Sequence, residues 1–327
     1  MYKAKEERYS AMPYRRCGKS GLLLPALSLG LWHNFGSVDD YANSKAILEC
    51  AFDHGITHFD LANNYGPVAG SAETTLGRVL KDALHPYRDE LIISTKAGYG
   101  MWPGPYGDWG SKKYLFASID QSLRRLGLDY VDIFYHHRPD PHTPLEETIL
   151  ALDLLVKQGK ALYIGISNYN AEESLAAVKL LSELKTPFVL HQMRYNLMER
   201  WAEEGLLSLL ASAGIGAIAY SPLAQGLLTE RYLDGIPQDS RMAREEFLKS
   251  ERLTEDYLKG INQLKQIADE RGQSVAQLSI AWLLRNEGIS SVLVGASSTA
   301  QLKDNIKALE ALSFSQEELD AIDAIAW

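Results

Sequence analysis

Short apolar runs that alternate with longer amphipathic segments constrain the fold of this chain more than any other feature. Eight runs have the β-branched, apolar character of buried strands, and they cover residues 25–31, 57–62, 91–96, 131–137, 161–167, 188–193, 216–221 and 291–296. Strands that alternate with helices form a parallel sheet with both faces covered. Eight such units predict an α/β fold of the (β/α)8 TIM-barrel type.

A doubly wound sheet is the alternative fold. Its usual signature is a G-x-G-x-x-G turn between the first strand and a helix, and the sequence contains no such turn. The nearest candidate, Gly98-Tyr99-Gly100, leads into a loop rich in Trp and Pro instead of a helix. The closed barrel is therefore the favoured architecture.

The length of the chain leaves room for additions to a barrel. A bare barrel needs about 250 residues, and this chain has 327, which we assign to a single domain over residues 1–327. We expect a β-hairpin of Tyr14–Arg16 and Leu22–Leu24 that closes the bottom of the barrel. We also expect two inserted loops, an aromatic one at 99–110 and a second one at 225–252.

Helix starts carry recognisable capping residues. Ser or Asn followed three positions later by Glu or Gln forms a capping box, and this spacing occurs at Asn170, Ser274 and Ser315. Thr143 followed by Pro144 predicts another helix start, with Thr143 at the N-cap and Pro144 at the first helical position.

Charge and cysteine content exclude several kinds of partner. The chain has 33 Lys and Arg against 42 Asp and Glu, a net charge of −9, so we expect no nucleic-acid partner. Cys17 and Cys50 are too few for a disulfide scaffold and are not spaced as a metal site. No export signal and no run of 18 apolar residues occur. We therefore expect a cytoplasmic protein with no metal and no membrane partner.

Polar residues gather where the predicted strands end, which is where parallel barrels place their working groups. Asp60 ends one strand and Tyr65 follows it, Lys96 ends the next, and His136 and His137 end the one after. Because side chains alternate along a strand, only one of these two histidines faces the barrel mouth.

These residue types form a coherent acid–base set. A phenol has a pKa of about 10, so a nearby ammonium such as Lys96 is needed to favour its anion, and Asp60 would keep that ammonium charged. A histidine would orient a substrate oxygen. A tuned phenol of this kind can protonate the alkoxide that hydride addition to a carbonyl produces.

Two other chemistries fit some of these residues. Lys96 could form a Schiff base in an aldolase, and that activity would not depend on a nicotinamide cofactor. His137 and His191 could also bind a divalent metal. Asp60 is the one clear carboxylate beside them, which is too few ligands for a typical coordination shell.

The strand ends resemble those of the aldo-keto reductases over almost the whole chain. The matching stretches are 59–66 (FDLANNYG), 93–98 (ISTKAG), 132–140 (DIFYHHRPD), 164–168 (IGISN), 191–196 (HQMRYN), 220–229 (YSPLAQGLLT) and 293–306 (LVGASSTAQLKDNI). The branch it resembles holds bacterial L-glyceraldehyde 3-phosphate reductases and the β subunits of voltage-gated potassium channels. The resemblance implies a catalytic tetrad of Asp60, Tyr65, Lys96 and His137, with His136 turned toward the helices.

The resemblance also implies a site for NADPH or NADP+ in the barrel mouth. Ser167, Asn168 and Gln192 would bind the carboxamide, Tyr220 would stack on the nicotinamide ring, and Trp32 and Asp60 would flank it. The pyrophosphate would lie along 221–228, and the adenosine end would lie at the last strand-to-helix turn, with two arginines near the 2′-phosphate. Together these residues are Ser221, Pro222, Leu223, Ala224, Gln225, Gly226, Leu228, Arg231, Arg241, Gly295, Ser297, Gln301, Asp304 and Asn305.

The resemblance implies reduction of small aldehydes or ketones, including L-glyceraldehyde 3-phosphate or methylglyoxal, and assembly into a tetramer or octamer. Trp32, Trp102 and Trp109 are expected to line the substrate pocket with Tyr65 and His137. The alternative is a redox-sensing, NADPH-binding subunit of the channel type. Those subunits resemble this chain but carry Asn where it has His137, which favours the enzyme.

Overall fold

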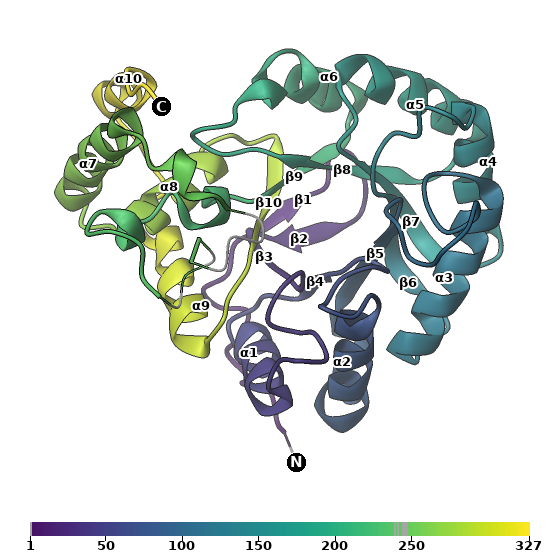
Figure 1. The fold of residues 1–327 in the computed structure, drawn as a ribbon. Coiled ribbons are helices and arrows are strands. Elements are labelled where there is room, and N and C mark those ends of the chain that lie inside the picture. The colour runs from purple at the N-terminus through teal and green to yellow at the C-terminus, as the bar shows by residue number, and fades with distance from the viewer. Residues whose placement is uncertain (1, 239, 241, 244–247) are drawn as a thin grey trace.

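Eight parallel strands of the described chain close into a barrel, as Figure 1 shows. The computed structural model describes residues 2–238, 240, 242–243 and 248–327. The strands follow one another around the ring in the order β10-β3-β4-β5-β6-β7-β8-β9. They are β3 (Leu27–Gly30), β4 (His58–Asp60), β5 (Ile92–Ala97), β6 (Val131–His136), β7 (Ala161–Ser167), β8 (Phe188–Arg194), β9 (Gly216–Tyr220) and β10 (Ile289–Val294). The predicted (β/α)8 TIM barrel is confirmed.

Helices surround the ring and connect its strands (Figure 1). They are α1 (Tyr41–Asp53), α2 (Ser71–Val79), α3 (Lys112–Leu126), α4 (Leu145–Lys157), α5 (Ala171–Leu184), α6 (Leu206–Ala213), α7 (Glu255–Glu270), α8 (Val275–Leu284), α9 (Thr299–Ile306) and α10 (Gln316–Asp323). α7 and α10 lie side by side outside the ring, where Arg271 and Glu318 form an ion pair at 2.9 Å. The helices thus cover the outer face of the barrel.

The capping residues define most of the predicted helix starts. Capping boxes are present at Asn170, Ser274 and Ser315. The prediction at Thr143 was wrong by one position, because α4 begins at Leu145 with Pro144 as its N-cap and no side-chain cap bond. The loop before α4 is held instead by Asp140, whose Oδ1 accepts hydrogen bonds from the backbone amides of residues 142 and 143.

The predicted hairpin closes the bottom of the barrel. It consists of β1 (Tyr14–Arg16) and β2 (Leu23–Pro25), which pair antiparallel. Its Leu22 and Leu24 pack in one apolar cluster with side chains from β6, β8, β9 and β10. The amide of Lys19 donates to the carbonyl of Gly214 at 2.8 Å, which ties the hairpin turn to the end of α6.

A glycine gives the barrel interior the room it needs for a large ring. A Cβ added at Gly165 in β7 would lie 2.2 Å from Cε1 of Tyr135 and 3.0 Å from the carbonyl of Leu190. Tyr135 is fully buried. Tyr135 thus packs closely against β7, in the same apolar cluster as Leu22 and Leu24.

Candidate active site

The four predicted catalytic residues lie together at the barrel mouth. Asp60 is the last residue of β4, Lys96 lies near the end of β5, and His137 follows β6 directly. Tyr65 comes from the loop between β4 and α2 and keeps partial exposure, whereas Asp60 and Lys96 are fully buried. The closed ring brings these separate segments to one end of the barrel.

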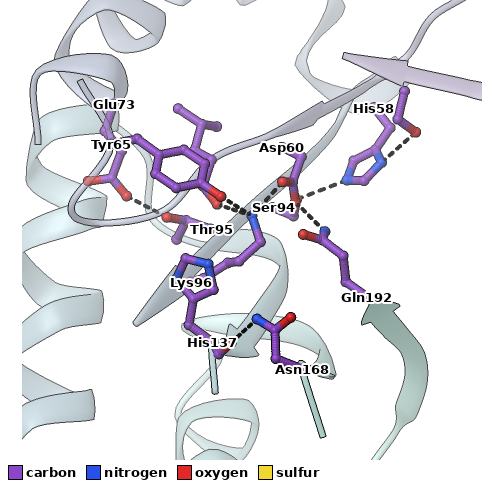
Figure 2. Close-up of polar contacts among 12 residues, drawn as sticks. His58, Asp60, Tyr65, Glu73, Ser94, Thr95, Lys96, His137, Asn168 and Gln192 are labelled. Atoms are coloured by element: carbon purple, nitrogen blue, oxygen red, sulfur yellow. Dashed lines mark hydrogen bonds and ion pairs between the residues drawn. The ribbon is translucent and has the colours of Figure 1, made fainter. Parts of the chain in front are cut away.

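Lys96 connects the members of this group, as Figure 2 shows. Its ammonium donates to Asp60 Oδ2 and to the carbonyl of Leu61 at 2.6 Å, and it lies 3.5 Å from the hydroxyl of Tyr65. An ammonium has three N–H donors, so these acceptors account for all of them. The arrangement suits a charged lysine and not the free amine that a Schiff base requires.

Electrostatics keep a proton on the Tyr65 hydroxyl. Burial raises its pKa well above 10, and the carboxylate of Asp60 raises it further. Burial also lowers the pKa of Lys96, an effect that Asp60 opposes. The sequence predicted that Lys96 would make Tyr65 more acidic, but desolvation is the larger effect here. The phenol is therefore neutral near pH 7, the state that a proton donor needs.

His137 faces the mouth and His136 faces away from it, as expected. The His137 ring lies 5.9 Å from the Tyr65 ring between centroids, and burial and Lys96 lower its pKa well below 6.5. Its Nδ1 is buried and has no hydrogen-bond partner within the described chain. His136 bonds the Tyr169 hydroxyl at 2.6 Å in the helix layer. His137 is thus a neutral imidazole beside the phenol.

The residues predicted to bind the carboxamide surround the same group. Asn168 donates to the carbonyl of His137 at 3.0 Å and accepts from the hydroxyl of Tyr220 at 2.7 Å. Gln192 donates to Asp60 Oδ1 at 3.1 Å. Ser167 is fully buried, and its hydroxyl has no partner within the described chain. A buried hydroxyl of this kind fits a bound amide, which offers both donors and acceptors.

The predicted pyrophosphate and adenosine residues lie along two loops. After β9, the chain turns through a short helix, η4 (Ala224–Gly226), with positive φ at Ser221, Ala224, Gln225 and Gly226. The amides of Ala224, Gly226 and Leu228 already bond within this turn, which begins with Pro222 and Leu223. Their role toward a phosphate stays a prediction.

At the other end of the predicted site, the loop after β10 is open above Gly295, where a Cβ would contact nothing. Ser297 bonds Gln301 at 2.9 Å, and Asp304 accepts from Gln277 at 3.0 Å. The side-chain amide nitrogen of Asn305 is buried with no partner among the described residues. Arg231 is exposed in η5 (Glu230–Tyr232), and Arg241 lies outside the described residues. Unpartnered buried groups thus occur at both ends of the site, which fits a dinucleotide.

The aromatic loop between β5 and α3 is held by Arg138, a residue for which the sequence predicted no role. The guanidinium of Arg138 lies 3.7 Å from the Trp109 ring and 4.2 Å from the Tyr99 ring. It also donates to the carbonyl of Gly98 at 2.7 Å and to Asp108 at 2.8 Å. A cation between two aromatic faces is a stabilising contact. Arg138 therefore fixes the loop over the mouth.

The tryptophans predicted to line the substrate pocket make aromatic contacts within the protein, and their place in a pocket stays a prediction. Trp102 packs against Tyr114 at 5.0 Å and Trp32 against His33 at 4.2 Å. The aromatic ring of this loop that contacts His137 is Tyr99, at 4.7 Å. Tyr99 follows β5 by two residues, and its position next to the strand end was the available signal.

Two features are absent from the residues that the structure describes. No group of three or more His, Cys, Asp or Glu side chains in these parts of the chain is placed to hold a metal ion. No helix among them has the length and apolar character to cross a membrane.

Comparison with known proteins identifies the family of the chain. A model of the Aldo/keto reductase family matches residues 26–326. L-glyceraldehyde 3-phosphate reductase from Escherichia coli O157:H7 is 59% identical over 98% of this chain and 94% of its own length. A probable voltage-gated potassium channel subunit beta from Arabidopsis thaliana is 41% identical over 92% of each chain. The chain therefore belongs to the aldo/keto reductase family.

Proposed function

We propose that this protein is an NADPH-dependent reductase of small aldehydes, in which Tyr65 donates the proton. The observation that carries the proposal is the linked set of Asp60, Lys96 and Tyr65 beside a neutral His137. Bound NADPH would supply the hydride that reduces the carbonyl carbon. Ser167, Asn168, Gln192 and Tyr220 are the residues that would hold its nicotinamide end.

The side chains divide the remaining work. Tyr65 holds a proton at its hydroxyl, because burial keeps its pKa high. Lys96 lies 3.5 Å away and offers positive charge to the phenolate that forms when this proton leaves, and Asp60 keeps that charge in place. His137 presents a neutral ring beside Tyr65 and would orient the carbonyl oxygen. Together these groups stabilise and protonate the developing alkoxide.

The substrate class follows from the relatives. Two relatives, 59% and 58% identical, are named L-glyceraldehyde 3-phosphate reductase. We propose the same aldehyde as a substrate, together with small dicarbonyls such as methylglyoxal. The preference for NADPH rests on the expected arginines near the 2′-phosphate, of which Arg231 is described and exposed.

The decisive test compares Tyr65→Phe with the unaltered protein. The variant keeps the ring and loses the hydroxyl, so NADPH binding should stay nearly unchanged. The rate of aldehyde-dependent NADPH oxidation should fall by about 100-fold or more, because a general acid contributes roughly 100- to 10,000-fold. The panel should hold both enantiomers of glyceraldehyde 3-phosphate and methylglyoxal, with NADH as a control. Undiminished turnover in Tyr65→Phe would overturn the mechanism.

A binding subunit remains the second candidate, because a relative named as a channel subunit is 41% identical. The same assay separates the two. Tight NADPH binding without oxidation by any aldehyde would favour the binding subunit.

A further inference from the structure

A chain of buried hydrogen bonds runs through the barrel interior to Asp60. Ser291 Oγ lies 2.6 Å from Ser28 Oγ, which lies 2.8 Å from His58 Nδ1. His58 Nε2 lies 2.9 Å from Ser94 Oγ, which lies 2.7 Å from Asp60 Oδ1. The first four residues are Ser291, Ser28, His58 and Ser94, and we call them the relay. Figure 2 labels His58, Ser94 and Asp60 along it.

The relay follows the order of the strands around the ring. Its residues lie on β10, β3, β4 and β5, which are neighbours in the barrel. The four members of the relay and Asp60 are all fully buried, at 0% exposure each. Buried polar groups persist only when they are hydrogen-bonded, so each member depends on the next.

The protons in the relay can be assigned by elimination. The carboxylate of Asp60 only accepts hydrogen bonds, so Ser94 uses its one proton to donate to Asp60. His58 must then donate from Nε2 to Ser94, which leaves Nδ1 of a neutral ring as an acceptor. Ser28 therefore donates to His58, and Ser291 donates to Ser28. Every hydrogen bond between members of the relay points toward Asp60, and the Ser291 hydroxyl also lies 3.4 Å from the carbonyl of Ala26.

The charge of His58 decides whether this order holds. Burial lowers the pKa of His58 to about 4, so the ring is neutral near pH 7. Asp60 opposes this effect and Lys96 adds to it. Only a charged His58 would donate from both nitrogens and reverse Ser28 and Ser291. The order is therefore fixed at neutral pH.

We propose that the relay holds the Asp60 carboxylate in place beside Lys96, which makes His58 and Ser94 positioning residues for the proposed reduction. Asp60 Oδ2 pairs with Lys96, and Oδ1 accepts from Ser94 and Gln192. A buried ion pair is stable only when its remaining lone pairs are also satisfied. Hydrogen bonds that all point one way polarise one another and strengthen the last one. The part of the proposal that concerns catalysis rests on the proposed function.

The first experiment needs neither cofactor nor turnover. Nitrogen-15 NMR of histidine-labelled protein reports which ring nitrogen carries the proton. The expected result for His58 is the neutral ring with the proton on Nε2, unchanged between pH 7 and pH 5. A proton on Nδ1, or a charged ring at pH 7, would overturn the relay whether or not the protein reduces aldehydes.

The second experiment measures kcat and KM for Ser94→Ala, with folding checked by thermal unfolding. The charged and titratable groups that face Asp60 are Lys96, Tyr65, Tyr135 and His58. Loss of the Ser94 donor leaves Asp60 Oδ1 with fewer hydrogen bonds, so the carboxylate holds Lys96 less firmly beside Tyr65. The kcat should fall about tenfold, as expected for a hydrogen bond to a charged group, while the KM for aldehyde stays nearly unchanged.

Matched variants separate positioning from packing. His58→Phe should behave like Ser94→Ala, and His58→Gln should restore most of the activity, because its amide can accept from Ser28 and donate to Ser94. If His58→Phe does not fold, Ser28→Ala breaks the next bond and should produce a smaller loss of kcat. Ser290→Ala is the control, because this buried neighbour of Ser291 bonds the carbonyl of Arg16 instead. A kcat that stays unchanged in both Ser94→Ala and Ser28→Ala would refute the proposal.

Discussion

Removal of the Arg138 guanidinium should release the aromatic loop over the mouth. Arg138→Ala loses a charged hydrogen bond to Gly98 O, two stacked rings and an ion pair with Asp108. A hydrogen bond from a charged donor contributes about 1.5–3 kcal/mol, each cation–π contact about 0.5–1 kcal/mol, and a partly exposed ion pair about 0–1 kcal/mol. These contributions sum to about 2.5–6 kcal/mol, and a value near the low end, about 3 kcal/mol, corresponds to roughly 100-fold in the population of the closed loop.

The loop also holds a strained residue that this contact must keep in place. Trp109 has a φ of 70°, a left-handed conformation that a non-glycine residue adopts at a cost of about 1 kcal/mol or more. Without Arg138, relaxation of Trp109 would favour the open loop. The open loop would also withdraw Tyr99 from His137.

Hydrogen exchange measured by mass spectrometry is the direct assay. The amide of Met101 bonds Gly107 O at 2.8 Å, and the amide of Gly110 bonds Asp140 at 2.8 Å. Both amides should exchange about 100-fold faster in Arg138→Ala and by an intermediate amount in Arg138→Lys, which keeps the charge without the planar group. In kinetic assays the KM for aldehyde should rise more than kcat falls.

The matched control is Arg124→Ala, which removes an exposed arginine from α3, the helix that follows the loop. It should leave loop exchange and KM unchanged. Equal exchange rates in Arg138→Ala and the unaltered protein would refute the reasoning, because they would show that the loop stays closed without the contact.

Two further predictions concern stability. Burial lowers the pKa of His191 to about 4, below the value of about 6.5 in the unfolded chain, so the unfolded state binds the extra proton as pH falls. The contribution of His191 to the free energy of unfolding should be complete above pH 6.5 and fall by about 1.4 kcal/mol per pH unit toward pH 4. Urea unfolding of His191→Gln should therefore show a shallower pH dependence of this free energy. An equal slope in the two proteins would contradict the assignment. Gly165→Ala should lower the free energy of unfolding by about 1–3 kcal/mol, because its Cβ would lie 2.2 Å from the Tyr135 ring. Gly21→Ala, with nothing within 4 Å, is the control, and equal losses in the two variants would argue against the clash.

The sequence predicted the fold well because each strand and helix of the barrel is determined by residues that are close together along the chain. The apolar runs and capping boxes place the strands and helices within a few residues of their observed bounds. The ends of the predicted strands are enough to point to Asp60, Lys96 and His137. The prediction of Thr143 as the N-cap was wrong because a Thr-Pro pair fits a helix that starts at either Pro144 or Leu145. The hydrogen bonds that Asp140 accepts from the loop select the start at Leu145.

The parts of the site that the sequence missed depend on contacts between distant strands. Ser28, Ser94 and His58 look like ordinary buried residues in the sequence. Their link becomes visible only when three neighbouring strands bring them into one chain of hydrogen bonds. The pKa of Tyr65 likewise depends on how deeply the ring is buried, which spacing along the chain does not reveal. Arg138 is adjacent to His137 in sequence, but its importance comes from the loop that folds over it.

The pairing of β10 with β3 has a consequence for how the molecule is made. Ser28 and Ser291 are separated by 263 positions, and Arg15 bonds the carbonyl of Ile289 across 274. During synthesis the barrel cannot close until β10, its last strand, has been made and can pair with β3, its first strand. If the relay operates as proposed, its first bond forms at this final step, so recovery of activity on refolding would mark ring closure.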